Sequence, residues 1–101
     1  MLRVELESNF LRPGQENGLV ATSDSPLSVE ILCFVQPPRP PQLSGCPECG
    51  RFNIESGVRF SFNANQRLFQ NASGYLKLTV SNLQGEKWQR NIDVDGRTLT
   101  A

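Results

Sequence analysis

Histidine is absent from this chain of 101 residues, and its absence limits the chemistry that the protein can carry out. Without imidazole there is no Ser-His-Asp triad, and no side chain has an ordinary pKa close to neutral pH. A glycine-rich loop between a strand and a helix, which would bind phosphate, is missing too. The carboxylates are spread along the chain and form no recognisable hydrolytic pair. We therefore expect a protein that is not an enzyme and has no cofactor.

An excess of charge of either sign is also lacking. Ten basic and ten acidic residues give a net charge of zero, and they are scattered without a run of like sign. Binding to nucleic acid or to an anionic membrane surface requires clustered Lys and Arg. We therefore expect no nucleic-acid partner and no membrane partner.

Long hydrophobic runs are missing as well, and no window approaches the length of a transmembrane helix. Residues 1–7 alternate apolar and charged side chains, whereas a signal peptide needs a continuous apolar stretch. The three cysteines are an odd number, which fits a reducing compartment better than a disulfide framework. Unless a precursor was trimmed or another export route is used, we expect a protein that stays where it is made, in the cytoplasm or associated with a virion.

What the chain does contain is a series of short segments in which apolar and polar residues alternate, as they do in half-buried strands. The predicted strands are residues 2–7, 19–22, 27–36, 51–54, 58–64, 74–81, 88–94 and 97–100. Residues 66–70 are ambiguous and fit either a helical turn or a short edge strand. This spacing predicts one antiparallel β-sandwich domain over residues 1–101, with about seven or eight short strands.

The strongest of these strands is residues 27–36. Leu32 and Phe34 add apolar bulk to its second face, so we expect a central strand that is covered on both sides for part of its length. Cys33 lies on the first face and is interpreted as a small buried hydrophobic residue.

Three segments, Phe10–Gln15, Gly57–Phe62 and Gly74–Val80, together with the hairpin that follows, resemble an immunoglobulin-like β-sandwich. The inter-sheet cysteine pair and central tryptophan of antibody domains are not matched. Trp88 comes late in the chain, and Cys33 has no obvious partner in a late strand. The resemblance implies an adhesive, accessory or assembly module, and it carries over no functional residues because fold does not determine function.

The predicted sandwich is interrupted by a proline-rich and cysteine-rich loop at residues 37–50. Pro37–Pro41, with Arg39 between two proline pairs, fits a polyproline II ligand for an SH3 or WW domain. The alternative is a stiff crossover between two strands.

The most specific local motif is Cys46-Pro47-Glu48-Cys49-Gly50, which is similar to the knuckle of rubredoxin-like and zinc-ribbon sites. Two thiolates with two residues between them can bind one zinc ion, but a closed structural site needs four ligands. Cys33 is a possible third ligand, and a two-fold dimer would supply two sulfurs from each chain. Free thiols and a local disulfide remain as alternatives. A redox-active pair is not favoured, because no helix follows Cys49.

These features together predict a non-enzymatic structural or protein–protein interaction module. It would be an accessory subunit of a larger assembly, such as a virion or a surface complex, and would bind a protein partner or self-assemble. We expect Arg39, Leu43, Tyr75 and Trp88 to make partner contacts, since Tyr, Trp and Arg are enriched where interfaces are strongest, although Trp88 also fits the core. The alternative function is a small zinc-binding protein that uses Cys46 and Cys49.

Overall fold

The computed structural model describes residues 1–36 and 49–97, and within them it contains eight strands and no helix. The strands are β1 (Arg3–Leu6), β2 (Phe10–Leu11), β3 (Glu16–Thr22), β4 (Leu27–Gln36), β5 (Gly50–Ile54), β6 (Arg59–Asn63), β7 (Ser73–Asn82) and β8 (Lys87–Asp95). The predicted all-β class is confirmed. In the described part of the chain, no helix is long and apolar enough to cross a membrane.

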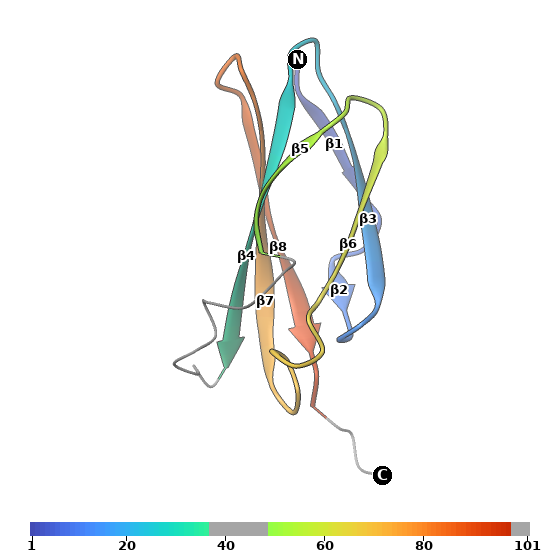
Figure 1. Cartoon of the computed structure of the whole chain (residues 1–101), viewed down its shortest axis with the longest axis vertical. Coiled ribbons are helices and arrows are strands. Elements are labelled where there is room, and N and C mark those ends of the chain that lie inside the picture. The colour runs from blue at the N-terminus through green and yellow to red at the C-terminus, as the bar shows by residue number, and fades with distance from the viewer. Residues whose placement is uncertain (37–48, 98–101) are drawn as a thin grey trace.

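The strands form two sheets that pack face to face as a sandwich. One sheet has the order β1-β3-β6, and the other has the order β2-β8-β7-β4-β5. Figure 1 shows β4, β7 and β8 in one layer and β3 and β6 in the other. Neighbouring strands are antiparallel except β2 and β8, which run parallel.

The core lies between the two sheets and follows the alternation of the sequence. In the central pair β4–β7, Val29 lies opposite Val80 and Ile31 lies opposite Leu78, and all four side chains are buried. Burying a side chain of this size stabilises the fold by about 1.5–3 kcal/mol. The remaining buried hydrophobic residues are Leu11, Leu19, Ala21, Leu27, Cys33, Val35, Phe62, Ala64, Phe69, Ala72, Leu76, Ile92 and Val94.

The chain changes sheets between β1 and β2. β1 pairs with β3 in the smaller sheet, whereas β2 pairs with β8 in the larger one. The buried Asn17 side chain holds the crossing, because its Nδ2 donates to the Ser8 carbonyl oxygen at 2.9 Å. The Asp93 amide donates to the Asn9 carbonyl oxygen at 3.1 Å. β2 is missing from the predicted strands because two residues are too short to show a period.

The prediction that β4 is covered on both sides is wrong. Leu32 and Phe34 are 39% and 36% exposed, and no described strand packs over them. Alternation alone does not reveal this, since a second apolar face can be buried by another layer or left open to a partner.

The ambiguous segment after β6 is a set of turns in which Phe69 is completely buried. Phe69 N donates to the Asn65 carbonyl oxygen at 3.2 Å, and Ala72 N donates to the Phe69 carbonyl oxygen at 3.2 Å. The turns thus place an aromatic ring in the core from a segment without strand pairing. The hydrogen bond from Phe69 to Asn65, four residues earlier, closes a single helical turn, which is one of the two alternatives that the sequence offered; the other, an edge strand, is wrong.

Candidate interaction surface

The outer face of the five-stranded sheet carries a row of aromatic side chains. By strand register, Phe34 lies beside Tyr75, Tyr75 beside Asp93, and Asp93 beside Phe10. The rings of Phe34 and Tyr75 stack with their centroids 4.8 Å apart. Phe10 is 45% exposed at the far end of the row. Four neighbouring strands therefore present three aromatic rings to solvent along one line.

The next rows along the same face become polar. Leu32 lies beside Lys77 in the row that follows the aromatic one. One row further, Glu30 forms an exposed ion pair with Arg51 of β5, with its Oε2 3.4 Å from Arg51 Nη2. An exposed ion pair of this kind contributes little to stability. The result is an apolar patch at one end of the face, with the exposed Asp93 carboxylate between Tyr75 and Phe10 and with balanced charges along its border.

Such an arrangement suits contact with another protein. Exposed apolar patches rimmed by polar residues mark interaction sites, and aromatic side chains contribute most where interfaces are strongest. We name the patch formed by Phe10, Leu32, Phe34 and Tyr75 the aromatic patch.

The sequence-predicted contact residues divide among three places. Tyr75 belongs to the aromatic patch. Trp88 is half-buried on the inner side of β8 and packs against the core, and the guanidinium of Arg90 lies 5.2 Å from its ring centroid. Arg39 and Leu43 lie outside the described residues. Phe10 and Phe34 were not among the predicted contact residues. For Phe34 the available signal was its aromatic side chain on the second face of the predicted strand, whereas Phe10 lies in a strand too short to show a period.

The cysteine arrangement differs from the predicted one. Cys33 of β4 forms a disulfide with Cys49, which directly precedes β5, and their Cα atoms are 6.5 Å apart. Cys33 is buried, as the sequence predicts, but it is bonded to a cysteine at the start of the neighbouring strand, a pairing that the sequence did not indicate. Cys46 lies outside the described residues.

Gly50 makes this pairing possible. Its φ of 132° lies in the region that favours glycine, and it rotates the backbone between β5 and Cys49. Cys49 would otherwise lie opposite Leu32 on the outer face, since Gly50 pairs with Ile31. Zinc binding through Cys46 and Cys49 would require this disulfide to be reduced. Among the described residues, no group of three or more His, Cys, Asp or Glu could hold a metal ion.

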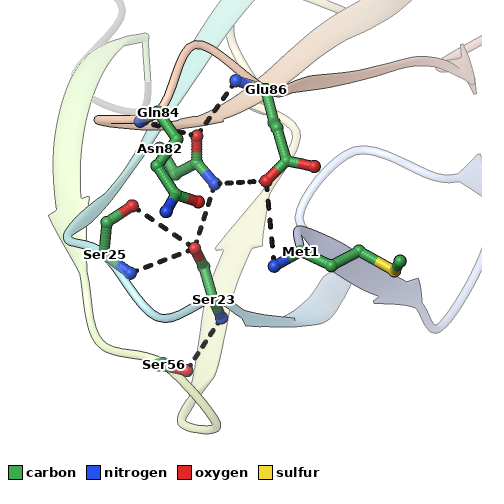
Figure 2. Close-up of polar contacts among 7 residues, drawn as sticks. All are labelled: Met1, Ser23, Ser25, Ser56, Asn82, Gln84 and Glu86. Carbon is green, nitrogen blue, oxygen red and sulfur yellow. Dashed lines mark hydrogen bonds and ion pairs between the residues drawn. The ribbon is translucent and has the colours of Figure 1, made fainter.

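A polar cluster joins the loops at one end of the sandwich (Figure 2). The buried Asn82 side chain donates from Nδ2 to Ser23 Oγ and to Glu86 Oε1, both at 3.0 Å. Its Oδ1 accepts from the backbone amides of Gln84 and Glu86 at 3.1 and 3.0 Å. Asn82 lowers the pKa of Glu86 by donating to its carboxylate. All four hydrogen-bonding positions of the Asn82 side chain are filled, so Asn82 holds the loops of this cluster together.

A second polar group lies on the outer face of the smaller sheet. Arg59 of β6 donates to Glu7 through Nε and Nη2, at 2.5 and 3.0 Å, and to Glu16 through Nη1 at 3.2 Å. The hydrogen bond from Arg59 holds the pKa of Glu7 below its ordinary value of 4.5. The two carboxylates in turn raise the pKa of Arg59. The trio is exposed and ties β6 to β3 and to the end of β1.

In the comparisons with known proteins, no family model matches the chain and no curated protein matches it. Its function must therefore be inferred from the geometry of its own residues.

Proposed function

We propose that this protein is a non-enzymatic interaction module that binds a protein partner through the aromatic patch. The observation that carries the proposal is the stacked pair Phe34–Tyr75 on an uncovered sheet face, flanked by the exposed side chains of Phe10 and Leu32. A regular strand scaffold keeps these side chains in place before binding, so little side-chain freedom is lost on association.

The strand order supports an immunoglobulin-like sandwich for this module. In that fold, one sheet contains the first, second and fifth strands, and the other contains the last two strands beside the third. The orders β1-β3-β6 and β8-β7-β4-β5 are similar to this arrangement. The disulfide differs, because it joins two strands of one sheet instead of bridging the two sheets.

The proposed role is that of an accessory subunit in a larger assembly, such as a virion or a surface complex. The absence of histidine and the balanced charge favour such a contact function over catalysis or nucleic-acid binding. A partner surface that is apolar at its centre and mixed in charge at its rim would complement the aromatic patch.

The proposal is tested by quantitative affinity capture from the native source with three tagged forms. Phe34→Glu places a charge in the middle of the aromatic patch. Leu83→Glu is the matched control, since Leu83 is 79% exposed in the β7–β8 hairpin. We expect wild type and Leu83→Glu to capture the same partner and Phe34→Glu to lose it by about ten-fold or more.

Thermal unfolding of the same three forms shows whether the variants remain folded, and light scattering measures self-association. Loss of self-association in Phe34→Glu alone would identify a second copy of the chain as the partner. Equal capture by all three forms, with equal oligomeric state, would refute the proposed role of the aromatic patch.

A further inference from the structure

We propose that the disulfide between Cys33 and Cys49 is a redox-controlled clip on strand β5. A dithiol reductant would open it and release β5 from the sheet, while the rest of the sandwich stays folded. This inference concerns a covalent bond and the strand that it holds, so it stands independently of the proposed partner.

β5 is weakly anchored compared with the strands beside it. It is the last strand of its sheet in the described part of the chain and pairs only with β4. Its five residues alternate between half-buried and exposed, and none is fully buried. β4 and β7 instead pair along ten positions and contribute much of the core. Local opening begins where few apolar side chains are buried, so β5 is the strand that we expect to open first.

The disulfide holds one end of this strand. Cys49 directly precedes Gly50, so the bond to Cys33 fixes the start of β5 against β4. At its other end, β5 runs into a turn in which the Gly57 amide donates to the Ala21 carbonyl oxygen at 2.8 Å. That contact reaches the smaller sheet and does not depend on β4–β5 pairing. Opening the disulfide therefore removes the cross-link that holds the start of β5 against β4, and leaves only the loop backbone to join the two strands covalently.

The two sulfurs differ in access. Cys33 is only 5% exposed, whereas Cys49 is half-buried at the sheet edge. A thiolate of the reductant attacks Cys49 Sγ, the bond to Cys33 breaks, and Cys33 leaves as a thiolate that takes up a proton. The second thiol of the reductant then attacks the mixed disulfide. This releases Cys49 as a thiol and oxidises the reductant to its own disulfide.

Release of β5 would change the surface of the protein. Phe52 of β5 lines a cleft of about 620 Å³ between the sheets, and its ring centroid lies 5.7 Å from that of Phe60. The buried Ile31 lies at the same cleft. Removing Phe52 widens the cleft and uncovers the β4 backbone from Leu27 to Ile31, where β5 was paired. An unpaired strand edge of this kind can accept another strand.

Hydrogen exchange measured by mass spectrometry tests whether the disulfide holds β5 in the sheet. The Cys46→Ser variant is used so that the third thiol cannot exchange with the disulfide. It is compared before and after reduction by a dithiol at neutral pH without denaturant. We expect the amides of residues 50–54 to exchange about ten-fold faster or more after reduction, with those of residues 76–80 unchanged.

Three outcomes would overturn the inference. These are resistance of the bond to reduction in the folded protein, retained protection of residues 50–54, and loss of protection across the whole chain. A Cys33→Ala/Cys46→Ser double variant checks the result without reductant and should show the same local exchange. If that variant does not fold, the bond supports the entire sandwich and is not a local clip.

Discussion

Phe34 and Tyr75 stack across β4 and β7 with their ring planes 18° apart, on the side of the sheet that faces away from the core. Phe34 is 36% exposed although both its neighbours in sequence are buried. A stacked aromatic pair on an outer sheet face contributes to the stability of the free protein and also prepares a rigid apolar surface. The two contributions can be measured separately.

A double-mutant cycle of Phe34→Ala and Tyr75→Ala should give a coupling energy of about 0.5–1 kcal/mol, because stacked cross-strand rings interact beyond their buried area. The measurement is urea unfolding of wild type, both single variants and the double variant. Pairing Phe34→Ala with Thr79→Ala, two rows away on β7, should give additive effects within about 0.5 kcal/mol. A coupling energy near zero for Phe34 and Tyr75 would contradict the stacking.

The pKa of Glu7 predicts a specific acid sensitivity. The Arg59 hydrogen bond lowers this pKa below 4.5 in the folded state. The ionised Glu7 side chain therefore stabilises the fold at every pH above its pKa in the unfolded chain. This stabilisation is lost as the pH falls through the folded pKa. Between about pH 5 and about pH 3, Glu7→Gln should therefore lose less stability than wild type.

The matched control is Glu5→Gln on β1, which ends just before Glu7, since Glu5 is exposed and forms no ion pair with the described residues. It should follow the wild-type curve of unfolding free energy against pH. Identical curves for wild type and Glu7→Gln would contradict the assigned hydrogen bond. The measurement is urea unfolding at a series of pH values.

Asn82→Ala should lower the free energy of unfolding by about 1–3 kcal/mol, because it leaves buried hydrogen-bonding groups without partners. The affected groups include the backbone amide of Glu86, which donates to Asn82 Oδ1. Gln84→Ala is the control, because Gln84 is exposed and contributes only its backbone amide to this cluster. Its effect should stay within about 0.5 kcal/mol. Equal stability of the two variants in chemical denaturation would argue against the role of Asn82.

Gly74→Ala should destabilise the fold by about 1–3 kcal/mol, as overpacking of a tightly filled site does. A Cβ at position 74 would overlap the carbonyl oxygen of Phe34 and meet Val35 Cα at 3.0 Å. Both contacts involve the β4 backbone, which cannot move aside as a flexible side chain would. Ser73→Ala, at the preceding position, is the control and should melt close to wild type. An unchanged melting temperature for Gly74→Ala would contradict this packing.

Gly50→Ala should reduce the yield of the disulfide between Cys33 and Cys49, because a φ of 132° is unfavourable for alanine. Apart from its two chain neighbours, no described residue lies within 4 Å of a Cβ at this position, so we expect the effect to come from the backbone conformation. Gly85→Ala in the β7–β8 hairpin also has a positive φ and serves as the control for general strain. Non-reducing peptide mapping of both variants after oxidative refolding measures the yield. A full yield for Gly50→Ala would show that the turn at Gly50 is not required.

The sequence was sufficient to predict most of the strands. β4 begins at Leu27 and ends at Gln36 as expected, and its inward residues, among them Val29 and Ile31, are buried. This works because the side chains of a strand alternate between its two faces, so one buried face leaves a local pattern in the sequence. The candidate contact Tyr75 was found in the same way, as an aromatic residue on the polar side of a predicted strand.

Three features depended on the tertiary structure. These are the pairing of β2 with β8, the disulfide between Cys33 and Cys49, and the exposure of Phe34. The strand pairing and the disulfide join segments that are separated in the chain. The exposure of Phe34 depends on whether another layer covers its face of the sheet. Alternation in the sequence shows which residues share one face of a strand, but it does not show what packs against that face. The sequence by itself thus determined the strands and their inward residues, and only the packing of the two sheets decided which face became the aromatic patch.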